Sequence, residues 1–219
     1  MDTVKTNKAI FVTYEGIEGA GKSTQLSLVA SHFTDNAKKV FQTREPGGTE
    51  VAEKIRSILI HPVHETLHPK TELYLMQAAR VQHIEHKIRP ALSTHDVILC
   101  DRFIDSSTVY QGIGRELGVT WVESLNRFST GDLYPDITFF IDIPVDLSLS
   151  RMKQRKNLKK DKSQDRFENE SAAFYTTLRN GYLELAKKHQ DRFIVLDGTL
   201  SKEALVALQI QKIEEKIRS

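Results

Sequence analysis

The sequence predicts an α/β protein with a five-stranded parallel sheet and helices on both faces. The first observation is that short apolar runs, as expected of buried strands, recur at residues 10–14, 40–43, 97–100, 137–141 and 193–196. The second is that segments with helical spacing lie around them, at residues 23–33, 50–60, 71–93, 145–155, 168–188 and 202–217. The third is that polar or glycine-rich motifs follow the first four runs, where the carboxyl ends of parallel strands gather and ligands bind.

The composition limits the classes of protein. A chain of 219 residues that is 39% hydrophobic and 27% charged can bury one full core, so we expect residues 1–219 to form one domain. A net charge of +2 argues against nucleic acid or a membrane as a general partner. There is no signal-like apolar segment or run of about 18 apolar residues, so we expect a cytoplasmic protein. The single cysteine, Cys100, lies in an apolar run and should be buried.

The first strand leads into a complete phosphate-binding motif. Residues 16–23 read Gly16-x4-Gly21-Lys22-Ser23, between a predicted strand and a predicted helix. The glycines let backbone N–H groups turn toward phosphates, Lys22 reaches the outer phosphates, and Ser23 offers a hydroxyl to Mg²⁺. Thr24 supports the turn. The loop alone would suit an ATPase, a GTPase switch or a kinase.

One arginine follows each of the next two strands, and a third lies on the apolar face of the predicted helix at 71–93. Arg44 follows the second strand and Arg102 the third, while Arg80 falls on the apolar stripe that Leu73, Met76, Ile84 and Ile88 form. A buried guanidinium needs an anion, so Arg80 should meet either a protein carboxylate or a substrate phosphate. If all three arginines share one cleft, the acceptor of the phosphoryl group is itself anionic.

Two strands end in a carboxylate that could serve beside Mg²⁺. Asp101 follows the third apolar run and Asp142 the fourth. Asp101 is the preferred metal residue because Arg102, an anion-binding cation, follows it. For Asp142 a strand-end or helix-capping role is the stronger alternative.

The last third of the chain carries a basic stretch and a final amphipathic helix. Residues 151–166 hold eight lysines and arginines against two aspartates, which alone would equally suit a solvated face or a nucleic-acid patch. In the helix at 202–217, Leu205, Leu208, Ile213 and Ile217 predict ordinary core packing.

Four motifs in order give a family resemblance. GIEGAGKST, TREPGGTE, AARVQH and DRFIDSSTVYQG together resemble the thymidylate kinases, over about residues 11–166 and more weakly to the end. The resemblance implies a P-loop nucleoside monophosphate kinase fold with a short mobile lid. It also implies transfer of the γ-phosphoryl group of ATP to dTMP, with Mg²⁺ as cofactor, in dTTP synthesis. The family's members are commonly homodimers that pair through helices, so we expect one here.

The resemblance assigns the nucleotide donor to the P-loop and the acceptor's phosphate to two arginines. Glu18 matches the acidic loop residue that reaches the acceptor's sugar, and Arg44 and Arg102 match the contacts to its phosphate. Pro46 matches a proline that is cis in the family. The residues assigned to ATP are Gly16, Ile17, Glu18, Gly19, Ala20, Gly21, Lys22, Ser23 and Thr24.

The resemblance assigns further side chains to the thymine base. Arg56 and Arg80 match the pair on the base side, Ser107 and Gln111 match the polar residues that read the base's edge, and Tyr110 matches the residue that leaves no room for a 2′-hydroxyl. Met76 departs from the pattern, because many relatives carry a phenylalanine there that stacks on thymine. Sulfur over a ring is a workable but less directional contact.

The basic stretch corresponds to the family's lid, at about residues 151–166. One branch of the family carries an arginine in the P-loop, where this chain has Gly19, so the charge of the migrating phosphoryl group must be met from elsewhere. We expect Arg155 and Arg166 to do so, together with Lys22 and Arg102 as catalytic residues; Arg151 and Lys153 are reserves.

Two other readings stay open. Met76 leaves room for a kinase of another nucleoside monophosphate. The P-loop and the basic stretch would also suit a P-loop ATPase or switch protein, although that leaves Arg44 and Arg102 without a task.

Overall fold

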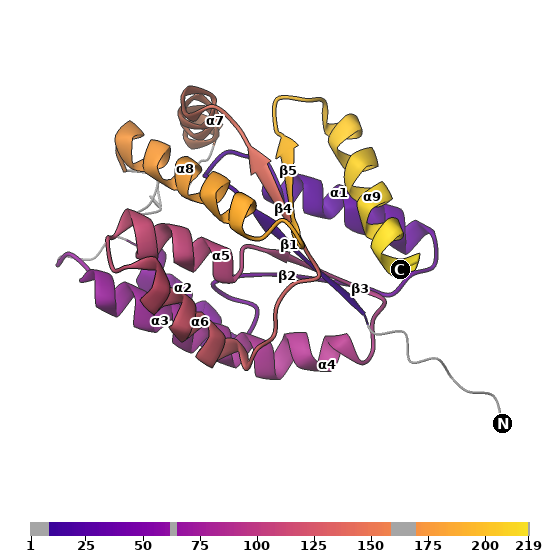
Figure 1. Ribbon diagram of the computed structural model, residues 1–219, viewed down its shortest axis with the longest axis horizontal. Coiled ribbons are helices and arrows are strands. Elements are labelled where there is room, and N and C mark those ends of the chain that lie inside the picture. Colours follow the sequence, from indigo (N-terminus) through magenta and orange to yellow (C-terminus); the bar gives the residue numbers. More distant parts are fainter. Residues whose placement is uncertain (1–8, 62–64, 159–169, 219) are drawn as a thin grey trace.

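The sheet is the framework of the molecule. A computed structural model describes residues 9–61, 65–158 and 170–218. In these ranges five parallel strands form one sheet in the order β2-β3-β1-β4-β5, which confirms the predicted fold class (Figure 1). The central strand β1 pairs with β3 and β4, so the segment before the P-loop is anchored on both sides. The strands are β1 (Ile10–Glu15), β2 (Val40–Arg44), β3 (Val97–Asp101), β4 (Ile137–Asp142) and β5 (Phe193–Asp197).

Each strand runs one residue beyond its predicted apolar run, and that residue is charged. The five additional residues stand at the carboxyl edge of the sheet, and the register places Asp101 beside both Tyr14 and Arg44. Charged groups therefore line the edge where ligands of parallel sheets bind. These residues are Glu15, Arg44, Asp101, Asp142 and Asp197.

Helices cover both faces of the sheet. In Figure 1, α1 and α9 lie on one side of the strands, and α3 to α6 with α8 lie on the other. No helix within the described ranges is long and apolar enough to cross a membrane. The helical elements are α1 (Lys22–Asp35), α2 (Glu50–Ile60), α3 (Pro69–His83), the π-helical turn η1 (Ile84–Ile88), α4 (Arg89–Leu92), α5 (Ile104–Ser107), the π-helical η2 (Thr108–Gly114), α6 (Val119–Thr130), α7 (Val145–Leu158), α8 (Ala172–Lys188) and α9 (Lys202–Arg218).

The alternation of β1 separates two hydrophobic cores. Val12 packs in a core with α1 and α9, while Phe11 packs with Ile84 and Ile88 on the opposite face. Cys100 is fully buried in this second core, as expected. The predicted apolar stripe of the helix at 71–93 is also confirmed, because its residues are buried along α3 and η1.

The helices between β3 and β4 were not predicted from the sequence. Residues 104–114 contain two glycines and several β-branched or hydroxyl side chains, which have low helix propensity. Tertiary packing overrides this propensity: a Cβ on Gly114 would lie 2.8 Å from Leu178 Cδ2, and a Cβ on Gly181 would lie 2.7 Å from Ile113 Cδ1. The glycines therefore let η2 and α8 approach closely, which positions the side chains of η2 at the cleft.

The prediction for the final helix was partly wrong. Leu205 and Ile213 are buried, but Leu208 and Ile217 are 41% and 38% exposed. The buried stripe instead includes Gln209, whose Nε2 donates a hydrogen bond to Gln25 Oε1 at 2.8 Å. Because the buried face contains the polar residue Gln209, the apolar pattern did not identify which face of the helix is buried.

Candidate active site

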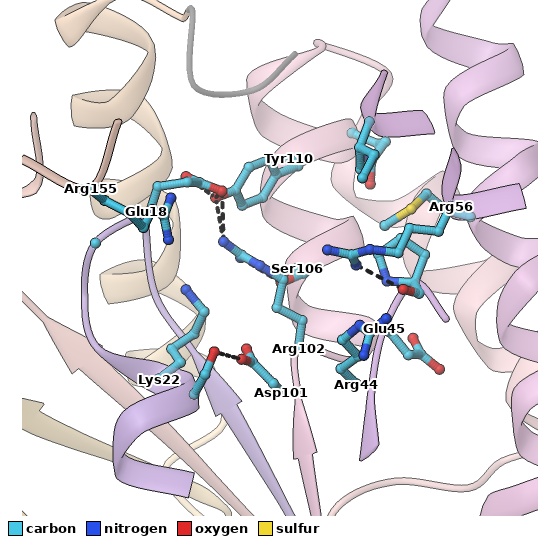
Figure 2. Close-up of a pocket in the computed structure, with 16 residues that line it drawn as sticks. Glu18, Lys22, Arg44, Glu45, Arg56, Asp101, Arg102, Ser106, Tyr110 and Arg155 are labelled. Atoms are coloured by element: carbon cyan, nitrogen blue, oxygen red, sulfur yellow. Dashed lines mark hydrogen bonds and ion pairs between the residues drawn. The ribbon is translucent and has the colours of Figure 1, made fainter. Parts of the chain in front are cut away.

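The main cleft lies at the carboxyl ends of β1, β2 and β3. In Figure 2, Lys22 and Asp101 lie on one side, Arg44, Glu45 and Arg56 on the other, and Arg102 between them reaches toward Glu18. Residues from six parts of the chain meet here: the P-loop, the end of β2, α2, α3, the segment from β3 to η2, and α7. The lining comprises Glu18, Gly19, Lys22, Ser23, Arg44, Glu45, Pro46, Arg56, Ile60, Met76, Asp101, Arg102, Ser106, Tyr110, Gln111 and Arg155.

The P-loop holds its lysine in a buried position. Gly16, Gly19 and Gly21 all have positive φ, which lets the chain turn tightly before α1 begins at Lys22. Lys22 Nζ donates hydrogen bonds to the carbonyl oxygens of Gly16 and Ile17, at 3.0 and 3.1 Å. Burial, with the nearby charge of Arg102, lowers the pKa of Lys22 to about 8.

The two residues predicted to serve Mg²⁺ lie in contact. Ser23 Oγ donates a hydrogen bond to Asp101 Oδ2. A hydroxyl and a carboxylate are the hard oxygen ligands that Mg²⁺ prefers, so the donor set fits this ion. Within the described residues there is no group of three His, Cys, Asp or Glu side chains that could hold a metal. Magnesium would therefore take its other ligands from water and nucleotide phosphates, as it does in many kinases.

Arg102 forms a cluster with Glu18 and Tyr110, two residues predicted to contact the substrate that accepts the phosphoryl group. Its Nη2 donates to Glu18 Oε1 at 2.7 Å and to Tyr110 Oη at 3.1 Å, and its Cζ lies 5.0 Å from the centre of the Tyr110 ring. Tyr110 Oη donates to the Glu18 carboxylate, with distances of 2.8 and 2.7 Å to its two oxygens. Arg102 has a φ of 69°, which is uncommon for a side chain other than glycine and is typical of functional positions. The structure thus brings Glu18, Arg102 and Tyr110 together.

Sequence reasoning missed a buried carboxylate beneath this cluster. Glu15 accepts hydrogen bonds from the backbone N–H of Phe103 and of Ser106, from Ser106 Oγ and from Tyr182 Oη, at 2.6 to 3.3 Å. Burial, reinforced by the negative charge of Asp105, raises the pKa of Glu15 to about 7. The signal in the sequence was a lone glutamate at the end of an apolar strand, directly before the P-loop.

The far wall carries Arg44 and Arg56. Arg44 Nη2 donates to both carboxylate oxygens of Glu53, at 2.9 and 2.8 Å, and its side chain is half exposed. Arg56 Nη1 donates to the carbonyl of Pro46 at 2.8 Å. The Glu45–Pro46 peptide bond is cis, as expected. Both arginines line the cleft.

The expectation that Arg80 would join these arginines in the cleft needs correction. Arg80 is 1% exposed and does not line the cleft; its Nε donates to Glu45 Oε2 at 2.8 Å. Of the two predicted alternatives, a protein carboxylate and a substrate phosphate, the structure shows the protein carboxylate. It belongs to Glu45, which directly follows β2. Ser107 is also buried behind the wall, where it accepts a hydrogen bond from Arg80. The other acceptors around the guanidinium are Gln77, Asn126 and the carbonyl oxygen of Phe103.

A second opening lies beside the P-loop, and Arg155 lines both it and the main cleft. Arg151 of α7 donates to the carbonyl of Gly19 at 3.1 Å. A Cβ on Gly19 would lie 3.0 Å from the carbonyl oxygen of Ser148, so α7 occupies the space that a side chain at this position would need. Of the proposed lid at 151–166, only residues 151–158 are described, as the end of α7; Arg166 lies outside the described residues.

Asp142 takes the structural alternative rather than a metal role. Its two carboxylate oxygens accept hydrogen bonds from Nε and Nη2 of Arg179, at 2.6 and 2.8 Å. This bidentate pair joins the end of β4 to α8.

Comparisons with known proteins agree on one family. The family model described as thymidylate kinase matches residues 14–208. The chain is 46% identical over 208 residues to a thymidylate kinase of Kosmotoga olearia, which covers 95% of this chain and 93% of that protein. It is 41% identical over 211 residues to a thymidylate kinase of Lactobacillus acidophilus, covering 96% of each chain. The crystal structure of thymidylate kinase from Ehrlichia chaffeensis is similar, with a TM-score of 0.73 and 31% identity over 94% of this chain and 99% of that one.

Proposed function

The chain belongs to the thymidylate kinase family, and from this premise we propose how its cleft transfers the γ-phosphoryl group of ATP to dTMP to give dTDP. One observation carries the proposal. Lys22 of the P-loop lines the same cleft as Arg102 and Arg44, so two anionic substrates have separate cationic groups within one cleft.

The donor binds at the P-loop. The backbone N–H groups of residues 16–24 surround the ATP phosphates, and Lys22 contacts the outer ones. Ser23 and Asp101 would hold Mg²⁺, which supplies charge neutralisation to the phosphates. The second opening continues from the P-loop toward Gly198 and Leu200, which gives the rest of the donor a place.

The acceptor phosphate binds between Arg102 and Arg44. Exposed ion pairs contribute little free energy, so a phosphate dianion can replace Glu53 as the partner of Arg44. The attacking phosphate oxygen is already ionised near neutral pH and needs no general base. Catalysis then consists of alignment and charge neutralisation, with Arg102 holding the acceptor and Arg155 and Arg166 meeting the charge of the migrating group.

The sugar and base of dTMP extend toward α2, α3 and η2. Tyr110, held by its hydrogen bonds to Glu18, packs where a ribose 2′-hydroxyl would otherwise fit. Arg56, Met76 and Gln111 line the base end. Arg80 and Ser107 support this end from behind, through the network that also fixes Glu45.

The enzyme is further proposed to be a homodimer in the cytoplasm. Its single cysteine suits a reducing compartment. Helices α2, α3 and α6 lie side by side (Figure 1). They expose large apolar side chains, which favours pairing between copies. These side chains are Val51, Ile58, Tyr74, Val81, Trp121 and Phe128.

A coupled assay with ATP, Mg²⁺ and a panel of monophosphates tests this function. We expect dTMP and dUMP to be preferred, and a preference for AMP, CMP or GMP would contradict the proposal. Arg102→Ala should lower kcat/KM for dTMP by at least about 10²-fold, because it removes a charged contact to the reacting acceptor. The matched control is Arg218→Ala, which removes an exposed arginine from the end of α9 and should leave kcat/KM unchanged.

A further inference from the structure

The amide of Gln111 separates the base end of the cleft from a buried carboxylate. Gln111 is fully buried and lines the cleft, and its Nε2 donates to Glu72 Oε1 at 2.7 Å. Its Oε1 is a buried oxygen that accepts no hydrogen bond in the described part of the chain. Leaving a buried acceptor unpaired is energetically unfavourable. This oxygen could therefore accept a hydrogen bond from a ligand with a donor group at the base end of the cleft.

Glu72 determines which end of the amide faces the cleft. An ionised carboxylate only accepts hydrogen bonds, so the NH₂ group of Gln111 must face Glu72 and the carbonyl must face away. In the opposite orientation the two oxygens would meet. Glu72 is itself fully buried, and Arg115 Nε lies 3.5 Å from its Oε2, which places a positive charge beside the carboxylate.

Arg115 also contacts α8 and the residues just before it. Arg115 Nη2 donates to Glu170 Oε1 at 2.6 Å, and Arg115 Cζ lies 4.9 Å from the centre of the Phe174 ring in α8. Gln111 and Arg115 come from η2 and its end, and Glu72 from α3. Of these contacts, the hydrogen bond between Gln111 and Glu72 is the one that involves the amide itself.

We propose that Glu72 is a positioning residue for base specificity, which holds the Gln111 carbonyl as an acceptor for the N3–H of thymine or uracil. A cytosine ring carries a lone pair at N3 and would place it against the same carbonyl oxygen. Glu72, which does not touch the substrate, thereby selects imide bases. The inference rests on the proposed binding of dTMP in this cleft and adds how that site rejects dCMP.

Glu72→Gln tests the inference with three monophosphates. Glutamine has nearly the same shape but can both donate and accept, so the Gln111 amide can turn in either direction. We expect the ratio of kcat/KM for dTMP over dCMP to fall by at least about tenfold, since a buried polar mismatch is relieved. The ratio for dTMP over dUMP should not change, because both bases carry N3–H. An equal loss on all three substrates, or an unchanged dTMP/dCMP ratio, would overturn the inference.

Two further variants serve as a control and as a substitute test. Glu170→Gln removes the charge from the Arg115–Glu170 pair but leaves Glu72 and Gln111 in place, and should keep the wild-type ratios; a fall in dTMP/dCMP here would trace specificity to the Arg115–Glu170 pair and overturn the inference. If thermal unfolding shows that Glu72→Gln does not fold, Gln111→Met decides, because an unchanged dTMP/dCMP ratio would show that the amide reads no base. Failure of the proposed function is distinct, since the wild-type enzyme would then not prefer dTMP and dUMP.

Discussion

At the scale of single residues, the site depends on ionisable groups that are buried before any ligand binds. Lys22 and Glu15 come from the P-loop and the strand before it, and both have pKa values moved toward neutrality. Burial disfavours the charged form of each, so both groups titrate within a range that experiments can reach. Their titrations give two separate predictions, one for ligand binding and one for stability.

Lys22 should take up a proton when ATP binds at alkaline pH. Its pKa is lowered to about 8 by burial and by Arg102, and the phosphates of ATP will raise it again. At pH 8.5 we therefore expect binding to take up a fraction of a proton, and ATP affinity to fall as the pH rises further. Titration calorimetry in buffers of different ionisation enthalpy measures the uptake. Lys22→Arg, which does not titrate in this range, should abolish it; equal uptake in both proteins would contradict the assignment.

Glu15 should make the protein less stable as the pH rises from about 4.5 to 7. In this window the folded protein keeps a proton on Glu15 that the unfolded chain, with its ordinary value of 4.5, releases. The unfolded state then binds fewer protons, so the free energy of unfolding falls with rising pH, by an amount on the order of a few kcal/mol. Urea unfolding of wild type and Glu15→Gln at pH 4.5 and 8 isolates this contribution. Parallel pH dependence in the two proteins would show that Glu15 has no raised pKa.

At the scale of elements, the sequence predicts best where one local pattern decides. The strands and the P-loop were predicted because apolar runs and motif spacing depend only on neighbouring residues. The pairing of Arg80 with Glu45 was not, because the partners are 35 residues apart and meet only when α3 packs beside the end of β2. The helical residues 104–114 were missed for the same reason, since they depend on the close packing of η2 against α8 at Gly114 and Gly181.

Helix α7 should supply charge to the migrating phosphoryl group. Arg155 lines both the main cleft and the second opening, and thus stands between the donor and acceptor sites. An arginine that acts on such a transition state is worth about 10³ to 10⁵ in kcat. We expect Arg155→Ala to lower kcat by a factor that approaches this range, and to raise KM for ATP by a much smaller factor. Lys156→Ala, the neighbouring cation on the same helix, is the control. A kcat equal to wild type for Arg155→Ala would remove Arg155 from the mechanism.

At the scale of the whole molecule, the acceptor side of the cleft and the proposed dimer surface share the same helices. Helix α2 directs Arg56 into the cleft and exposes Val51 and Ile58, which are 48% and 50% exposed. Helix α3 places Met76 in the cleft and exposes Tyr74, at 54%. Pairing through these helices would therefore hold the wall that binds the acceptor, while the P-loop lies on the other side of the cleft.

Ile58→Asp should convert a dimer of 25.0 kDa chains into monomers. A two-fold interface contains each substituted residue twice, so the change buries two unpaired carboxylates, which is strongly unfavourable. Analytical ultracentrifugation at micromolar concentration measures the state of assembly. Leu208→Asp is the matched control, because Leu208 is a similarly exposed aliphatic residue on α9, on the opposite side of the sheet (Figure 1). If dimerisation steadies the acceptor wall, the Ile58→Asp monomer should also show a raised KM for dTMP with little change for ATP. A wild-type monomer, or dissociation by Leu208→Asp alone, would place the interface elsewhere or remove it.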